Sequence, residues 1–169
     1  VFQFETKGEY QDRIGDFSFS DQLTQFQADQ RQILSLNSFV YDEEKSSKKE
    51  LPMTIFQFVD AKQLVDYLKV KGDYPTWLWY DRTKEAQYET KEMKKLGDFS
   101  VPIFSQSYNN FVSFIEMPIQ LETGYYLLQS EMNGFTHQVA VEVTDLSVYE
   151  SVNTNKILLW AWNIKEQTP

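Results

Sequence analysis

The strongest constraint on the fold is a pair of β-patterned segments joined by an Asn-Gly dipeptide. Residues 125–130 and residues 135–143 are rich in Tyr, Leu, Val and Phe, and they flank a turn that contains Asn133 and Gly134. Asn-Gly between two such segments is the short sequence signal that most favours a tight hairpin, because both residue types tolerate positive φ angles. We therefore predict an antiparallel β-hairpin in the last third of the chain.

Further apolar segments predict that most of the chain is built of short strands. Residues 33–41 and residues 51–59 are expected to form a second hairpin, whose tip is the charged segment 42–50. That segment contains no apolar residue, so we expect it to be a solvated loop. The other predicted strands cover 77–80, one or two segments within 99–117, 146–149 and 157–164, and the turn of the last pair is placed at 151–155.

Helical patterning is limited to short segments. Residues 61–69 have an apolar face and follow Asp60, which is a favourable N-cap. Ser20 similarly precedes residues 21–28, which are predicted to start a short helix, whereas residues 84–95 are charged and are expected to be irregular or loosely helical. Many short strands with little helix predict a mainly β protein, an immunoglobulin- or fibronectin-like antiparallel β-sandwich with one or two short helices.

The sequence divides into three parts. Residues 1–30 are polar with Phe at alternate positions, and they are expected to form an N-terminal arm or leading strands. Residues 31–145 are expected to form the sandwich. Residues 146–169 are either the first strands of a following domain or the closing strands of the same sandwich. Because the chain opens without Met or a leader and ends just after a strong strand, we expect a mature protein or a piece of a longer one.

The composition excludes several functional classes. The 169 residues include 41% hydrophobic and 16% aromatic residues, which is enough for a real core. The absence of cysteine removes disulfides, thiolate zinc sites and cysteine nucleophiles, and a single histidine rules out a multi-histidine metal site. The net charge of -9 argues against nucleic acid and anionic membranes as partners. No segment approaches the ~20 apolar residues that a membrane span needs.

No motif indicates catalysis or cofactor binding. The sequence has no G-x-S-x-G elbow, no D-x-D-x-D-G calcium loop and no glycine-rich phosphate loop. The carboxylates lie among lysines in polar segments such as 42–50 and 85–92, which is typical of a solvated surface. His137 lies on the apolar face of its predicted strand and is interpreted as a half-buried structural side chain. We predict that the chain is not an enzyme and that it has no catalytic, cofactor-binding or metal-binding residue.

Two tryptophan pairs are the candidate ligand or interface residues. Trp77 and Trp79 share one face of a predicted strand, which continues into Tyr80, and Trp160 and Trp162 share a face of another. An exposed pair would suit stacking against carbohydrate, whereas a buried pair would line the core or an interface. Apolar residues alternate with the second pair, so both faces of that strand are apolar, and we expect a covered strand.

Residues 117–128 resemble a known family. Their Leu-x-x-Gly-x-Tyr pattern is similar to the strand that closes a macroglobulin domain in bacterial alpha-2-macroglobulin-like proteins. In that family a hairpin follows, and then a V-[ST]-[DN]-L step enters the next domain; residues 143–146, Val-Thr-Asp-Leu, match this step. The family's T-G-x-P turn corresponds to residues 167–169, which lack the glycine. Upstream, residues 33–69 look like an early domain of the family, in which a strand runs into a short helix.

The resemblance implies a scaffold or interaction module in the N-terminal half of a large exported bacterial protein of the periplasm or cell surface. The partners it implies are neighbouring domains of a longer chain and proteases. In that family a protease cleaves a bait region, the molecule collapses, and a thioester can capture the attacker. The thioester requires a cysteine, so this chain cannot itself supply it. The alternative is a free-standing carbohydrate-binding or cell-surface-binding β-sandwich that uses Trp77, Trp79 and Tyr80.

Overall fold

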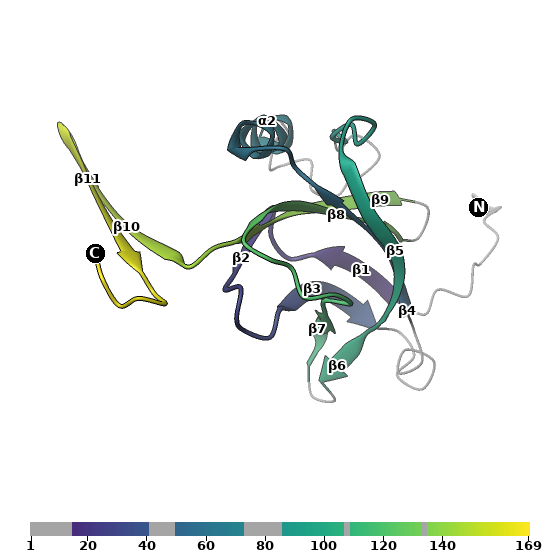
Figure 1. Cartoon of the computed structure of the whole chain (residues 1–169). Coiled ribbons are helices and arrows are strands. Elements are labelled where there is room, and N and C mark those ends of the chain that lie inside the picture. Colours follow the sequence, from purple (N-terminus) through teal and green to yellow (C-terminus); the bar gives the residue numbers. More distant parts are fainter. Residues whose placement is uncertain (1–14, 41–49, 73–85, 107–108, 133–134) are drawn as a thin grey trace, which may run out of the picture.

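The computed structural model describes residues 15–40, 50–72, 86–106, 109–132 and 135–169 (Figure 1). The described elements, in chain order, are β1 (Gly15–Phe19), β2 (Leu23–Phe26), β3 (Ile33–Val40), β4 (Glu50–Gln57), α2 (Ala61–Gly72), β5 (Lys94–Pro102), β6 (Phe104–Gln106), β7 (Asn109–Glu116), β8 (Gly124–Met132), β9 (Phe135–Val143), β10 (Leu146–Asn153) and β11 (Lys156–Asn163).

Two sheets pack face to face to form a β-sandwich. One sheet has four strands in the order β1-β3-β7-β6, and the other has five in the order β2-β9-β8-β4-β5. Neighbouring strands in the sheets are antiparallel except β2 and β9, which run parallel. The predicted mainly β sandwich is therefore confirmed, with one parallel pair that the sequence patterns did not indicate.

The hairpin predicted from residues 125–130 and 135–143 is present as β8 and β9. The two strands pair in continuous register from Gly124 opposite Val143 to Met132 opposite Phe135. Gly124, the glycine of the Leu-x-x-Gly-x-Tyr pattern, has a φ angle of 154°, which side-chain-bearing residues rarely adopt. A glycine is thus required where the chain enters this strand.

The main core lies between the two sheets. Leu34 and Leu36 of β3 and Ile115 of β7 come from the four-stranded sheet, and Ile55 of β4 and Leu128 of β8 face them from the other. Each of these side chains is at most 2% exposed. Complete burial of one such side chain contributes roughly 1.5–3 kcal/mol, so the alternating apolar residues of these strands supply most of the driving force for the sandwich.

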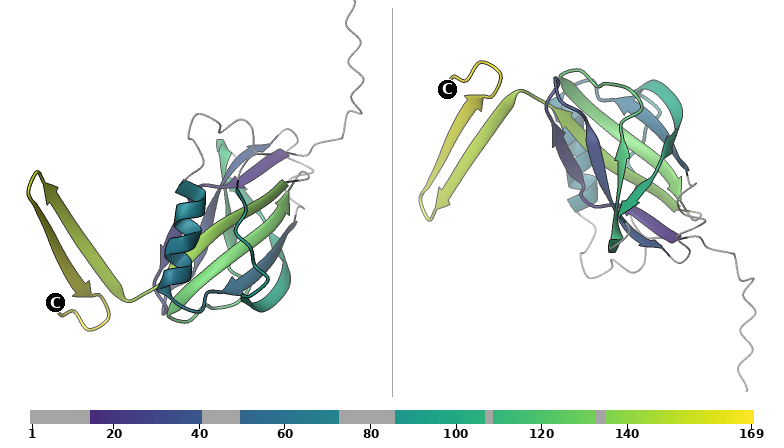
Figure 2. Two further views of the ribbon diagram at one scale, coloured as in Figure 1. Left: turned by 90° about the horizontal axis from the view of Figure 1, so that it is seen from above. Right: turned by 90° about the horizontal axis from the view of Figure 1, so that it is seen from below.

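A second apolar layer lies on the outer face of the five-stranded sheet, where α2 packs (Figure 2). Phe56 of β4 and Leu127 of β8 pack there in one cluster with Leu64 and Tyr67 of the helix. Both faces of the sheet are therefore covered. This double cover explains why residues 137–141 of β9 are buried at consecutive positions instead of at alternate ones.

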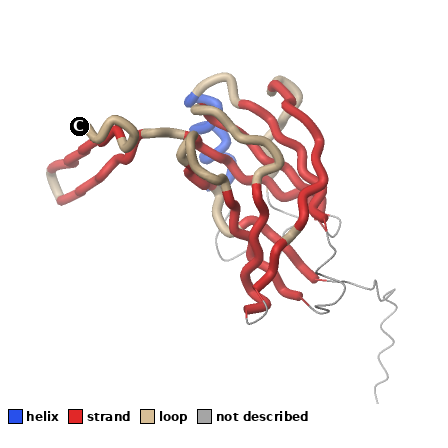
Figure 3. Tube along the Cα trace, turned by 60° about the horizontal axis from the view of Figure 1, so that its bottom comes forward, coloured by secondary structure: helices blue, strands red, loops and turns tan. Residues whose placement is uncertain are grey.

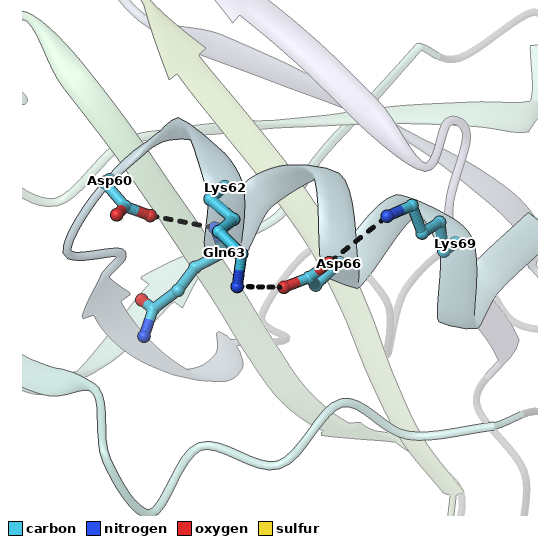
Figure 4. A network of polar contacts seen from close by, with 5 residues as sticks. All are labelled: Asp60, Lys62, Gln63, Asp66 and Lys69. Carbon is cyan, nitrogen blue, oxygen red and sulfur yellow. Dashed lines mark hydrogen bonds and ion pairs between the residues drawn. The ribbon is translucent and has the colours of Figure 1, made fainter.

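The start of α2 has the N-cap that the sequence predicts (Figure 4). The Oδ1 atom of Asp60 accepts a hydrogen bond of 3.0 Å from the amide of Gln63, whose own Oε1 accepts one of 2.8 Å from the amide of Val59. Further along the helix, the carboxylate of Asp66 forms ion pairs with Lys62 at 3.6 Å and with Lys69 at 3.4 Å. The helix runs three residues beyond its predicted end. No helix of the described residues has the length and apolar character that crossing a bilayer requires.

The predicted hairpin of residues 33–41 and 51–59 is wrong. β3 pairs with β1 and β7 in one sheet, whereas β4 pairs with β5 and β8 in the other. The chain therefore crosses between the sheets after β3. Alternating apolar residues identify strands but do not specify which strands pair, and here each strand lies in the interior of its own sheet.

One local prediction in the polar regions is wrong, and another is wrong only at its end. Residues 23–26 form β2 instead of a helix, because backbone hydrogen bonds with β9, such as Ala140 N to Gln22 O at 2.9 Å, outweigh the local preference for a cap at Ser20. Of the segment 84–95, residues 86–93 are irregular as predicted, but β5 begins at Lys94. β5 includes a register shift opposite β4 that accommodates an extra residue.

Candidate functional site

The candidate site is the β10–β11 hairpin, which projects from the sandwich at the C-terminal end (Figures 1 and 3). The two strands pair with each other from Leu146 opposite Asn163 to Asn153 opposite Lys156, and they form a separate two-stranded sheet. At the tip, the side-chain oxygen of Asn153 accepts hydrogen bonds from the backbone amides of Asn155 and Lys156, at 3.1 Å and 3.0 Å. The hairpin is therefore well paired internally, although it joins neither sheet of the sandwich.

One face of the hairpin is aromatic. Tyr149 lies directly opposite Trp160, and Ser147 lies opposite Trp162, so these four residues share a face. They line an open hollow of about 340 Å³. The rings remain accessible: Tyr149 is 61% exposed, Trp160 56% and Trp162 37%.

The two indole rings of the pair are perpendicular. Their centroids lie 6.3 Å apart, and the angle between the ring planes is 88°. This edge-to-face arrangement is favourable for an aromatic pair. It also means that the faces of Trp160 and Trp162 are not coplanar, so the two rings do not form one flat stacking platform.

The opposite face of the hairpin is aliphatic and equally exposed. Val148, Val152, Ile157 and Leu159 alternate with the aromatic residues along the two strands, and each is between 61% and 66% exposed. The expectation of a covered strand is thus not met within the described part of this chain. Large exposed apolar surfaces of this kind are typical of interaction sites and ligand-binding grooves.

The hairpin is connected to the sandwich by two residues, Thr144 and Asp145. The amide of Thr144 donates a hydrogen bond of 2.9 Å to Phe26 O at the end of β2, and the amide of Ile164 donates one of 2.7 Å to Asp145 O. The Nζ atom of Lys165 forms an ion pair of 2.8 Å with Asp29. The hydrogen bond from Lys165 to Asp29, the charge of that carboxylate and the more distant charge of Asp145 raise the pKa of Lys165.

The other residues singled out from the sequence differ in outcome. Trp77, Trp79 and Tyr80 lie outside the described residues, so their proposed contact with a ligand or interface stays a prediction. His137 is 6% exposed, more deeply buried than the half-buried position expected for it. Within the ranges that the structure describes, His, Asp and Glu form no group of three that could hold a metal ion.

Sequence reasoning missed three residues of this region. Tyr149 was assigned to a strand but not to the aromatic face, although pairing residues 146–153 with 156–163 about the tip would have placed it opposite Trp160. Asp29 and Lys165 are 136 positions apart in the sequence and only the fold brings them together. No local pattern indicates such a pair.

The described fold is similar to that of two solved fragments of native alpha-2-macroglobulin from Escherichia coli. The fragment spanning domains MG0-NIE-MG1 matches with a TM-score of 0.57 and 10% identity over 92% of this chain and 47% of that one. The fragment spanning NIE-MG1 matches with a TM-score of 0.55 and 11% identity over 93% and 74% of the two chains. This chain thus spans about half the length of the first fragment. No family model and no curated protein matches the sequence.

These comparisons confirm the resemblance noted in the sequence at the level of the fold. Identities of 10% and 11% carry no residue-level correspondence, so the likeness concerns the arrangement of strands. The part of this chain that the first alignment leaves uncovered is shorter than the β10–β11 hairpin, so at least some of the hairpin lies within the matched region.

Proposed function

We propose that this chain is a non-catalytic module of an exported bacterial macroglobulin-like protein. In this proposal residues 31–145, with leading strands from residues 1–30, form one macroglobulin-type sandwich, and residues 146–169 are the first strands of a following domain. The module acts as a scaffold and interaction domain in protease trapping, in the periplasm or at the cell surface. Its partners are the neighbouring domains of a longer chain and, through them, the trapped protease.

The observation that carries the proposal is the β10–β11 hairpin. Its strands belong to neither sheet, and nine of the large apolar side chains between Leu146 and Trp162 are at least 37% exposed. A hairpin that closed the same sandwich would place one of its faces in the core, but the core cluster contains no residue beyond Val143. A hairpin that begins a second sandwich has one face prepared for the core of that domain, which supports the division after Asp145.

Two further observations support the macroglobulin assignment. The fold is similar to alpha-2-macroglobulin fragments, and the match extends into the hairpin. Among the described residues, the groups with shifted pKa values are members of surface ion pairs or are tyrosines whose pKa is raised first by burial and then by nearby carboxylates. These features are typical of a structural module.

The domain division is tested by truncation after Asp145. The shortened chain loses the hairpin, the residues that follow it and the Lys165–Asp29 ion pair, which contributes little to stability because both side chains are exposed to water. We expect its unfolding temperature to lie within roughly 4 °C of that of the whole chain, as measured by circular dichroism. Leu36→Ala in the whole chain is the control for the loss of a buried core side chain, and it should lower the free energy of unfolding by about 2–5 kcal/mol. Unfolding of the truncated chain would show that the hairpin belongs to the first sandwich.

The trapping role is tested on the protein that contains this module in its natural chain. A trapped protease keeps its activity on a small chromogenic peptide but loses activity on a large protein substrate, because the surrounding molecule excludes the large one. We expect this split when the intact protein is mixed with a protease. Equal loss of both activities, or loss of neither, would contradict the role in trapping while leaving the fold assignment intact.

A further inference from the structure

The hairpin is held to the sandwich by two different kinds of contact. The first is a short backbone connection: Thr144 N to Phe26 O at 2.9 Å ties the end of β9 to β2, and Ile164 N to Asp145 O at 2.7 Å ties the end of β11 to the linker. Both bonds lie beside the same two linker residues. They form a pivot, because they fix where the hairpin leaves the sandwich but not the angle at which it leaves.

The second contact lies away from the pivot and joins two separate turns. Asp29 lies in the turn between β2 and β3, and Lys165 lies in the turn after β11. Their side chains meet at 2.8 Å. Among the described residues this is the ion pair that connects the sandwich with the segment following β11, so it restrains rotation about the pivot.

Each residue of this ion pair lies in a turn that further hydrogen bonds hold in place. The side-chain amide of Gln120 donates to Ala28 O and to Gln30 O on either side of Asp29. On the hairpin side, the Oδ1 atom of Asn163 accepts hydrogen bonds from the amides of Lys165 and Glu166, at 3.0 Å and 2.9 Å. Because neither turn has to be ordered when the ion pair forms, little of its energy is lost to backbone entropy.

We infer that the Asp29–Lys165 ion pair sets the orientation of the β10–β11 hairpin and that it is the salt-sensitive part of this junction. The hydrogen-bonded pivot persists when the ion pair is screened or removed, and the hairpin then samples a wider range of angles. This inference concerns the hairpin within this chain and holds whether or not a further domain follows it. Where one does follow, the same ion pair sets the angle between the two domains.

The test measures the spread of hairpin orientations directly. The chain has no cysteine, so Val65→Cys on α2 and Val152→Cys on β10, both exposed positions, accept spin labels without competing sites. Pulsed electron spin measurements then give the distribution of distances between the labels. In the otherwise unchanged chain at low salt we expect a single narrow distribution. Raising the salt from about 10 mM to about 1 M shortens the screening length from about 30 Å to about 3 Å and should broaden it.

Substitutions separate the ion pair from general effects of charge. Asp29→Asn and Lys165→Met should each raise the population of other orientations by up to about five-fold, the ceiling for an exposed ion pair, and the double variant should add nothing further. Lys156→Met is the matched control: its lysine begins β11 and makes no ion pair with a described residue, so the distribution should not change. A distribution that is already as broad in the unsubstituted chain at low salt, or equal broadening by Lys156→Met, would overturn the inference.

Discussion

The side chain of Gln32, at the entrance to β3, makes two hydrogen bonds to the backbone of a single distant residue. Its Nε2 atom donates to Leu121 O at 2.9 Å, and its Oε1 atom accepts from Leu121 N at 2.9 Å. The glutamine is 2% exposed, and its backbone carbonyl accepts a hydrogen bond of 2.9 Å from the amide of Met117. The side chain therefore satisfies both polar groups of a buried backbone residue that joins no strand, just before the chain enters β8.

Replacement of this glutamine by alanine leaves the amide and carbonyl of Leu121 buried without partners. Each unsatisfied group costs about 1–3 kcal/mol, so the loss of both should lower the free energy of unfolding of Gln32→Ala by about 2–6 kcal/mol in total. For a chain of this size that corresponds to a fall of roughly 4–24 °C in the unfolding temperature. Urea titration followed by circular dichroism measures the free energy, and a thermal scan measures the temperature.

The matched control uses the same residue type at the surface. Gln25 donates one hydrogen bond of 2.7 Å to the carboxylate of Glu142, and both groups are exposed to water. Water replaces that bond when Gln25 is changed to alanine, so the loss should stay below about 1 kcal/mol. If Gln32→Ala costs no more than Gln25→Ala, the buried bonds contribute nothing net and the reasoning is refuted.

A second variant gives the same site a pH signature. In Gln32→Glu, the neutral carboxyl can donate to Leu121 O and accept from Leu121 N, whereas the carboxylate faces a carbonyl in a buried site. The folded state should therefore hold the proton more tightly, with a pKa above the value of about 4.3 in the unfolded chain. Relative to the parent chain, stability should be nearly intact at about pH 4 and should fall as the pH rises towards the raised folded pKa. A constant difference between pH 4 and pH 7 would contradict this assignment.

Two smaller effects follow from surface contacts. Asp60→Ala removes the N-cap of α2 and should cost about 1 kcal/mol in urea unfolding, while the helix keeps its packing on the sheet. Hydrogen bonds from Lys95 and then from Thr54 lower the pKa of Asp98, so this carboxylate contributes stability above its unfolded pKa and loses it as the pH falls through the lowered folded value. Lys95→Met should raise the pKa of Asp98 towards its usual range, as measured by carboxyl carbon chemical shifts; an unchanged value would show that Thr54 alone sustains the shift.

Local sequence patterns predicted elements well where the signal was confined to neighbouring residues. The β8–β9 hairpin follows from its turn and its apolar strands, and the N-terminus of α2 follows from Asp60. Partner choice could not be obtained in this way. β3 and β4 are consecutive strands and show a similar alternation of apolar and polar residues, yet they lie in different sheets. The reason is that the stability of a strand depends on burial against elements far away in the sequence.

The same limit explains the incorrect helix at residues 21–28. A favourable cap contributes about 1 kcal/mol, whereas pairing along β9 gives β2 several backbone hydrogen bonds and packs Phe26 against the main core. The candidate site was predicted only in part for a similar reason. Trp160 and Trp162 are conspicuous in the sequence, but the hollow that they share with Tyr149 depends on the register between β10 and β11.

β9 and β11 show that the burial of a strand depends on its surroundings as well as on its own pattern. One face of β9 is apolar, whereas the other face, which includes Gln138 and Glu142, is largely polar. β9 is nevertheless covered on one side by the four-stranded sheet and on the other by α2, and Val139, Ala140 and Val141 are fully buried. β11 carries apolar side chains on both faces, a pattern that predicts a covered strand, yet seven of its eight residues are exposed. The pattern of a strand thus indicates which side chains favour burial, and the packing of distant elements decides whether they are buried.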